Sequence, residues 1–437
     1  MDDIFTRQQS ILIADVRQAG GGITDIFVQD DGTIGAAGEG IRREYKGEAD
    51  LIIDGNRAIA LPGLVNTHSH AAMSLLRGYA DDMILQDWLN QKIWPLEAHL
   101  TPSDVYWGTK LACLEMIKSG TVAFNDMYFM MEEAARAVGE AGIRATLSYG
   151  FIDLFSLEKR EAECKATENL VRHIRSLNNP RIKAAAGPHA IYTVSPEGLR
   201  WCAEFAAEQK IGIHVHLSET ETEVNDCIAR YGKRPAVHLD DCGLLTQRTV
   251  AAHCCWLDAA ECALLSKRGV SVSHNPSSNM KLATNRAMPY PLLNDAGVNV
   301  CLGTDGCASN NNLDMFGEAK TAALLQKFSW NNPTLLPAHE ALAMATVNGA
   351  RGLGLPTGTI VAGAPADIVL VTARTACNTP LHNAISNLVY SCSGGEVETT
   401  LCNGRVLMLE REVPGEEQIL SGAGKAAREL VRRAQSA

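Results

Sequence analysis

Histidine and aspartate recur along the chain at positions where short apolar runs end. His68 and His70 stand two positions apart in an extended run, and side chains two apart on a strand point to one face. Such a pair could bind a metal, or could bond to backbone groups at a strand end. His216 and Asp305 end two later runs. The four residues would supply three nitrogens and one oxygen, with a position left for water, so together they predict a metal centre.

Glu219 follows His216 by three residues in the run HLSE. A carboxylate there can reach a metal-activated water and act as a general acid and base. Alternatively, Glu219 is an acid at the start of the next helix, where the helix dipole favours it. His214 shares a face with His216 but does not end the strand, so we expect it in the protein interior.

A second metal in such a site would need a bridging group, for example a carboxylated lysine at the end of the fourth strand. That strand ends in GPHAIY, with His189, and Lys183 stands at its start. We therefore expect a single metal.

The elements that must hold these residues alternate along the chain. Segments with helical periodicity, such as 102–119 after Thr101, separate eight β-branched runs. The runs begin near Leu61, Thr121, Ile143, Ile182, Ile211, Thr249, Val270 and Val298. This alternation predicts an α/β fold, a (β/α)8 TIM-type barrel, whose chemistry sits at the C-terminal ends of the strands. Polar residues stand at those ends: His68, His70, Asp126, His216, His253, His274 and Asp305.

The two flanks of the chain predict β-structure outside the barrel. Residues 11–60 hold short extended runs, and a hairpin signal stands at Asn403-Gly404. Neither flank can bury a core alone, so we expect them to form one small β-sandwich. The expected division is residues 1–60 for the N-terminal part of the sandwich, 61–358 for the catalytic barrel, and 359–437 for its C-terminal part. A surface helix is expected over 416–435.

Composition narrows the class of protein. The 437 residues are 46% hydrophobic and 20% charged, with a formal net charge of −11, which disfavours a nucleic-acid partner. The 13 cysteines show no CxxC spacing, which argues against a disulfide framework or a thiolate zinc site. The acidic N-terminus lacks a signal sequence and no membrane span is visible, so we expect a cytoplasmic protein in a reducing compartment.

Several longer motifs resemble a known family. The runs PGLVNTHSH, HVHLSE, AAHC, SHNPSSN and GTDG resemble the amidohydrolase superfamily over nearly the whole chain. RGYADDMILQDWLNQKIWPLE and GPHAIYTVS resemble the 5-methylthioadenosine/S-adenosylhomocysteine deaminases. SYGFIDLF is most similar to the archaeal 5'-deoxyadenosine deaminase branch.

The resemblance implies one Zn²⁺ per subunit, with Fe²⁺, Mn²⁺ or Ni²⁺ as substitutes in vitro. Its ligands would be His68, His70, His216 and Asp305. Catalysis would use Glu219, His253 and Asp305, with water attacking carbon 6 of adenine and ammonia leaving. Asn275 and Asn279 are expected only to shape a loop at the barrel mouth.

The resemblance also implies the substrates: 5'-deoxyadenosine, 5'-methylthioadenosine, S-adenosylhomocysteine and adenosine, each converted to its inosine analogue. Substrate contacts would come from Trp88, Glu97, Tyr149, His189, Glu219 and Asp305, with Glu97 binding the ribose hydroxyls. Tyr149 stands where several S-adenosylhomocysteine deaminases carry an arginine, so uncharged 5' groups should be preferred. Lys165 is a second basic candidate for a 5' carboxylate. The expected partners are a nucleoside and further copies of the chain, as a dimer or tetramer.

Two alternatives stay open at the level of sequence. One keeps the metal-assisted hydrolysis but acts on guanine, a pyrimidine or a chlorinated triazine, none of which has a ribose for Glu97 to bind. The other is a barrel that has lost its metal and serves as a scaffold, which the retention of every candidate ligand disfavours.

Overall fold

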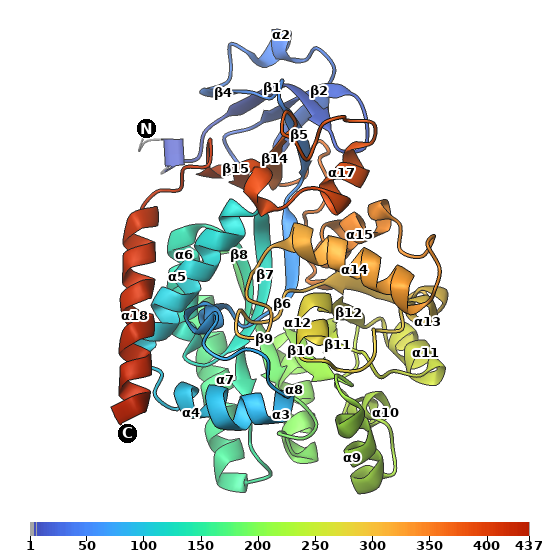
Figure 1. Ribbon diagram of the computed structural model, residues 1–437. Coiled ribbons are helices and arrows are strands. Elements are labelled where there is room, and N and C mark those ends of the chain that lie inside the picture. The colour runs from blue at the N-terminus through green and yellow to red at the C-terminus, as the bar shows by residue number, and fades with distance from the viewer. Residues whose placement is uncertain (1–3, 6, 437) are drawn as a thin grey trace.

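Eight parallel strands form the centre of the computed structural model, which describes residues 4, 5 and 7–436 (Figure 1). Neighbours in the sheet are neighbours in sequence, and the first and last strands meet where Thr67 Oγ1 donates to the Leu302 carbonyl at 2.9 Å. The strands are β6 (Leu64–Ser69), β7 (Thr121–Tyr128), β8 (Arg144–Phe151), β9 (Ile182–Pro188), β10 (Gly212–Leu217), β11 (Thr249–His253), β12 (Ser271–His274) and β13 (Asn299–Leu302). The predicted (β/α)8 barrel is confirmed.

The first barrel strand begins at Leu64 rather than near Leu61. The preceding run, β5 (Ala58–Pro62), pairs with strands of the other sheet, and Gly63 separates the two. A single apolar run in the sequence therefore contains two strands that belong to different sheets.

Helices surround the barrel. α5 begins at Pro102, as expected, because Asp104 Oδ2 accepts the Thr101 N–H at 2.8 Å in a capping box. The outer helices are α5 (Pro102–Lys118), α6 (Met131–Ala141), α7 (Leu157–Ser176), α8 (Pro196–Gln209), α9 (Glu221–Tyr231), α10 (Pro235–Asp241), α11 (Ala259–Arg268), α12 (Pro276–Lys281), α13 (Tyr290–Asp295), α14 (Met315–Ser329), α15 (Ala338–Met344) and α16 (Val347–Gly352).

A long connection between β6 and α5 contains only short helical segments. They are η1 (Ala71–Leu76), α3 (Leu85–Trp88), η2 (Leu89–Ile93) and α4 (Trp94–Glu97). Trp88, Ile93 and Leu96 are buried, so this connection packs onto the barrel at the end where the strands finish.

Both chain ends contribute to a second, mixed sheet, which lies above the barrel in Figure 1. β14 (Ile368–Thr372) pairs antiparallel with β5 and so joins the two flanks, as predicted. Its other strands are β1 (Ile11–Gln18), β2 (Ile23–Val28), β3 (Ile34–Gly38), β4 (Leu51–Asp54), β15 (Val397–Cys402) and β16 (Arg405–Met408). Ile13, Ile26 and Leu370 contribute to a separate hydrophobic core for this unit.

Short helices and one long helix complete the flanks. The short ones are α2 (Arg42–Tyr45), α17 (Ala384–Tyr390) and η3 (Gly394–Glu396). The long helix α18 (Glu416–Ser436) runs along α5 at the left of Figure 1. It buries one face through Ile419, Ala423 and Leu430, which confirms the expected terminal helix.

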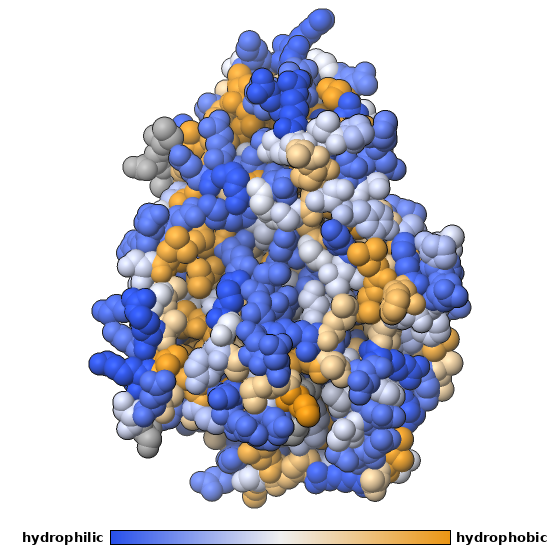
Figure 2. Space-filling model, viewed as in Figure 1, coloured by the Kyte–Doolittle hydropathy of each residue, from blue (hydrophilic) through white to orange (hydrophobic). Residues whose placement is uncertain are grey.

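The outer surface carries no extended apolar face in the view of Figure 2, where hydrophobic residues lie in scattered groups among hydrophilic ones. In the described part of the chain, no helix is both long enough and apolar enough to cross a membrane.

Candidate functional site

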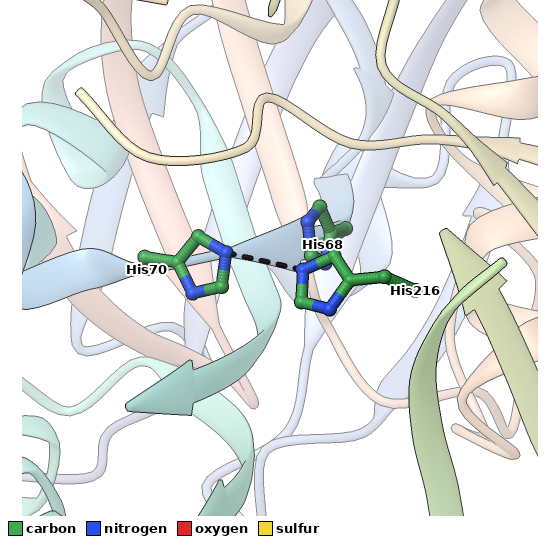
Figure 3. A group of neighbouring side chains, drawn as sticks. All are labelled: His68, His70 and His216. Atoms are coloured by element: carbon green, nitrogen blue, oxygen red, sulfur yellow. Dashed lines mark hydrogen bonds between the residues drawn. The ribbon is translucent and has the colours of Figure 1, made fainter. Parts of the chain in front are cut away.

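The four predicted metal ligands meet at the C-terminal end of the barrel. His68 lies in β6 and His70 directly follows that strand, whereas His216 comes from β10 (Figure 3). The Nε2 atoms of His70 and His216 are 3.4 Å apart. Asp305, just beyond β13, places Oδ1 3.3 Å from Nε2 of both His68 and His70. Three strands far apart in sequence thus deliver one compact cluster.

The hydrogen bonds of His70 and His216 fix which nitrogen faces the centre. His70 Nδ1 lies 2.6 Å from the Met127 carbonyl, and His216 Nδ1 lies 2.8 Å from the His189 carbonyl. Because a carbonyl can only accept, each neutral ring carries its hydrogen on Nδ1 and leaves a lone pair on Nε2. Two lone pairs 3.4 Å apart repel each other unless a cation lies near both, so this donor set fits a metal ion.

His68 is oriented by a chain of hydrogen bonds that runs through His214 to Ser148. Its Nδ1 lies 2.7 Å from His214 Nε2, and His214 Nδ1 lies 3.4 Å from Ser148 Oγ. Ser148 Oγ donates to the Asp126 carbonyl and so accepts from His214. This chain of hydrogen bonds leaves His68 Nε2 as an acceptor, and this buried atom has no hydrogen-bond partner among the described residues. His214 lies in the barrel interior, as expected, and acts on the site through His68.

Asp305 is held by a strained backbone and by two hydroxyls. Its φ is +64°, a left-handed conformation that costs an aspartate roughly 1–3 kcal/mol. Ser278 Oγ and Ser309 Oγ donate to Oδ2 at 2.6 and 2.9 Å, which leaves Oδ1 to face the histidines. Burial alone would raise the pKa of Asp305, but the two adjacent histidines hold it well below its usual value.

The cluster favours positive charge at its centre. Burial would lower the pKa of His70, but its hydrogen bond to Asp305 and the charge of that carboxylate raise it to about 9. Without a metal, His70 therefore holds an extra proton, and a divalent metal would replace that proton when it binds.

The two glycines of the GTDG motif allow the chain around Asp305 to pack closely against the segment that carries His68 and His70. A Cβ at Gly303 would lie 2.8 Å from the Cβ of His68, and one at Gly306 would lie 2.7 Å from Met73 Sδ. The chain on either side of Asp305 thus packs directly against the segment that carries the histidines.

His253, at the end of β11, lies beside the ligands without joining them. It lies close enough to His68 and Asp305 to be a possible third ligand. However, its Nδ1 accepts from the Asn279 amide at 2.9 Å and from the Asn275 amide at 3.3 Å. Its hydrogen therefore sits on Nε2, so the neutral ring is a donor and not a ligand. Asn275 and Asn279, expected only to shape a loop, orient this ring.

Glu219 faces the same space and does not cap a helix. The N-cap of α9 is Thr220, and the Ser218 and Glu219 N–H groups both donate to the Glu223 carboxylate at 2.8 Å. Glu219 is 7% exposed, and Oε1 lies 3.8 Å from His253 Nδ1. Burial, aided by the charge of Asp305, raises the pKa of Glu219 to about 8. The alternative role as a helix-start acid does not fit this geometry.

A cavity joins the cluster to the connection between β6 and α5. Trp88, Glu97 and His189 line it together with His70, His216, Glu219, His253 and Asp305. Glu97 Oε1 accepts from the Tyr128 hydroxyl at 2.6 Å, and burial raises the pKa of Glu97 to about 7. Tyr128 was not predicted from the sequence. It follows Asp126 by two positions on β7, and that spacing, which places both on one face of the strand, is the signal that could have identified it.

Tyr149 and Lys165 do not reach this cavity. The Tyr149 hydroxyl donates to Glu163 on α7 at 3.3 Å, and the residues lining the cavity on this side are Gly150 and Ile152. A side chain at position 149 points away because alternate residues of β8 face opposite sides. Lys165 is exposed on the outer surface of α7 and lines a separate groove.

The comparisons with known proteins give the family. A sequence profile described as "Amidohydrolase family" matches residues 59–407. The chain belongs to the amidohydrolase family. A 5'-deoxyadenosine deaminase of Methanoregula boonei is 70% identical over 434 residues, covering 99% of this chain and 98% of that protein. The 5-methylthioadenosine/S-adenosylhomocysteine deaminase 1 of Archaeoglobus fulgidus is 50% identical over 386 residues, with 88% and 90% covered.

A solved structure shares the fold throughout. It is a zinc-bound adenosine deaminase of Xanthomonas campestris, with a TM-score of 0.89, 34% identity, and 99% of this chain and 100% of that chain covered. The predicted membership of the methylthioadenosine/S-adenosylhomocysteine deaminase group of amidohydrolases is confirmed, and with it the prediction of an enzyme.

Proposed function

We propose that the protein is a zinc-dependent hydrolytic deaminase that converts 5'-modified adenosines to inosine analogues and ammonia. The observation that carries this proposal is one cavity lined by candidate metal ligands, by the acid Glu219 and by the buried carboxyl group of Glu97. The names of the relatives point to the same substrates. One metal per chain is proposed because the end of β9 offers His189 and no lysine, while Lys183 Nζ donates to the Gly354 carbonyl.

The chemistry divides between the metal and the side chains. When bound, zinc lowers the pKa of a coordinated water from 15.7 to roughly 7 and so supplies a nucleophile at neutral pH. Asp305 would take the proton of the attacking water and pass it to the amino group that leaves as ammonia, while the His253 Nε2–H would orient the water. Glu219, protonated near neutral pH because its pKa is about 8, gives its proton to the adenine ring nitrogen as carbon 6 becomes tetrahedral.

The part of the cavity lined by Glu97 and His189 suits a nucleoside. Tyr128 occupies one oxygen of Glu97, and the other has no protein partner among the described residues, so it can accept from a ribose hydroxyl. His189 Nδ1 is paired with Thr193 Oγ1 at 2.8 Å, and burial lowers the pKa of His189 to about 3. Because Thr193 Oγ1 donates to the Ala190 carbonyl at 3.2 Å, it accepts from His189 Nδ1, and the neutral ring keeps Nε2 as an acceptor. Free bases and triazines would leave Glu97 without a role.

The preference for the 5' group rests on the whole cavity rather than on Tyr149. No lysine or arginine is among the residues described as lining it. A homocysteine carboxylate would lack a charge-assisted partner worth about 1.5–3 kcal/mol. We therefore expect 5'-deoxyadenosine to be the best substrate, 5'-methylthioadenosine a good one, and S-adenosylhomocysteine poorer by about ten- to a hundredfold in kcat/KM.

Turnover of these three nucleosides and of adenosine by the zinc-loaded protein tests the proposal, with ammonia measured directly and metal content by elemental analysis. The expected result is deamination in the order given and about one zinc per chain. Absence of ammonia from every nucleoside would contradict the function, and a preference for S-adenosylhomocysteine would contradict the account of the 5' group.

We also propose a cellular location and an oligomeric state for the enzyme. We propose a cytoplasmic homo-oligomer, a dimer or tetramer. All thirteen cysteines are free thiols, which supports a reducing compartment.

A further inference from the structure

A second cavity, of about 700 Å³, opens at the opposite end of the barrel. It is surrounded by the beginnings of β9 and β10, the residue before β11, and the ends of α7, α8 and α16. It shares no lining residue with the cavity that holds the candidate metal site. Its volume is in the range of about 300–1,000 Å³ that is typical of small-molecule sites.

Each polar side chain that lines this cavity can donate a hydrogen bond, and none of those described is a carboxylate. Besides Thr146, it holds five cations and five carboxamides. The cations are Arg175, Lys183, Lys210, Arg248 and Arg351. The carboxamides are Asn125, Asn178, Asn179, Gln209 and Gln247. The chain has a formal net charge of −11, so this local concentration of positive charge favours a negatively charged ligand.

Helix ends explain only part of this charge. Arg175 and Arg351 lie in the last turns of α7 and α16, and Lys210 is the C-cap of α8. Each helix C-terminus carries about −0.5 charge, which offsets less than a third of the five positive charges. Lys183 on β9 and Arg248 in a loop have no such explanation.

The cations lack acidic partners of their own. Within the described residues, none of the five forms an ion pair, and the side chains of Lys210, Arg248 and Arg351 make no hydrogen bond. Arg175 donates to Gln209, and also borders a neighbouring groove that contains glutamates. Lys183 donates only to the Gly354 carbonyl at 2.9 Å, and burial together with nearby Arg144 lowers its pKa. Arg175, Lys210, Arg248 and Arg351 are solvent-exposed and Lys183 is half-buried, so an anion in the cavity would take the place of water as their partner.

We propose that this cavity at the N-terminal end of the barrel binds a small phosphate-bearing anion with two or more negative charges. Arginine and lysine would bind the phosphate oxygens by charge-assisted hydrogen bonds. The carboxamides would bind the remainder of the ligand, if it has one. The proposal does not depend on the proposed function, because no residue is shared between the two sites.

Calorimetric titration of the metal-loaded protein with tripolyphosphate, in low salt, tests the proposal. The expected result is one site per chain whose affinity falls as salt is added. The double variant Arg248→Gln/Arg351→Gln should bind about a hundredfold or more weakly, since two charge-assisted contacts are lost. Its turnover of 5'-deoxyadenosine without added anion should match that of the wild type.

The matched control is Lys267→Gln/Lys425→Gln, which removes the same charge from exposed positions outside the cavity and should bind like the wild type. Equal weakening in both double variants would show general attraction only and would overturn the proposal. No binding at millimolar tripolyphosphate, or a heat that merely follows loss of metal, would overturn it as well. Adenosine triphosphate in place of tripolyphosphate distinguishes a nucleotide from a simple phosphate: tighter binding assigns the carboxamides to the nucleoside, and equal binding assigns the site to the phosphates alone.

Discussion

The position of the ring hydrogen on four histidines determines which of them can bind a metal and which one donates a hydrogen bond. Carbonyls fix the hydrogen of His70 and His216 on Nδ1, and His214 does the same for His68, so three lone pairs converge. Two amides do the reverse for His253, whose Nε2 becomes a donor. Neighbouring imidazoles thus become ligands or a hydrogen-bond donor according to their partners.

Glu219→Gln should retain the metal and lose roughly 100- to 10,000-fold in kcat, because an amide can bond to a purine nitrogen but cannot pass it a proton. Steady-state kinetics and metal analysis check this. Glu221→Gln, which changes an exposed acid in the first turn of α9, is the control and should be fully active. Wild-type turnover by Glu219→Gln would remove Glu219 from the chemistry.

Asn279→Asp should lower kcat by about 100-fold without loss of metal, since the carboxylate would accept a hydrogen from His253 Nδ1 and leave Nε2 unable to donate. Asn279→Ala, which leaves the Asn275 amide as the donor to Nδ1, should be less impaired. Both variants are compared by kcat and metal content. If the aspartate variant is the more active of the two, the amide is oriented oppositely and His253 carries its hydrogen on Nδ1.

At the scale of elements, the strands were more predictable than the connections. Apolar runs with polar ends located the eight barrel strands and the residues His68, His216 and Asp305, because period-two alternation and strand-end position are both visible in sequence. The short helices α3 and α4 have no periodic apolar pattern, so Trp88 and Glu97 followed only from the resemblance. Residues that act through hydrogen bonds across the barrel, such as Tyr128 and Asn279, can be placed on a face by their spacing, but their hydrogen-bond partners are not visible in the local sequence.

Glu97 on α4 gives a prediction of its own. Glu97→Ala should lower kcat/KM for adenosine by about ten- to a hundredfold and leave 2',3'-dideoxyadenosine nearly unchanged, because only adenosine offers hydroxyls to the carboxylate. Tyr128→Phe, which keeps the carboxylate and removes its partner, should show a smaller loss with the same selectivity. An equal loss for both nucleosides would mean that Glu97 acts on folding rather than on ribose.

At the scale of the whole molecule, a buried ion pair joins the barrel to the terminal sheet. Arg144 on β8 donates to Asp367, just before β14, at 2.9 Å, and their side chains are 7% and 0% exposed. Asp367 Oδ1 also accepts the N–H of Asn403 at the hairpin between β15 and β16. Two segments of the C-terminal flank are thus fixed to β8, the strand next to the one that carries Asp126.

Asp367→Ala should destabilise the protein by about 3–5 kcal/mol, because it leaves the Arg144 charge buried and unpaired. Urea unfolding followed by circular dichroism measures the change. Asp240→Ala, which breaks a more exposed pair with Arg268, should cost less than about 1 kcal/mol. Equal costs for the two variants would show that the buried pair does not hold the two sheets together.

Turnover of 5'-deoxyadenosine in ¹⁸O-labelled water tests whether the protein deaminates a 5'-modified adenosine hydrolytically at carbon 6. Mass spectrometry of the nucleoside product is combined with an assay of ammonia. We expect 5'-deoxyinosine with one ¹⁸O atom in the base and one ammonia for each product molecule. Free adenine, a product without the label, or turnover without ammonia would contradict hydrolytic deamination.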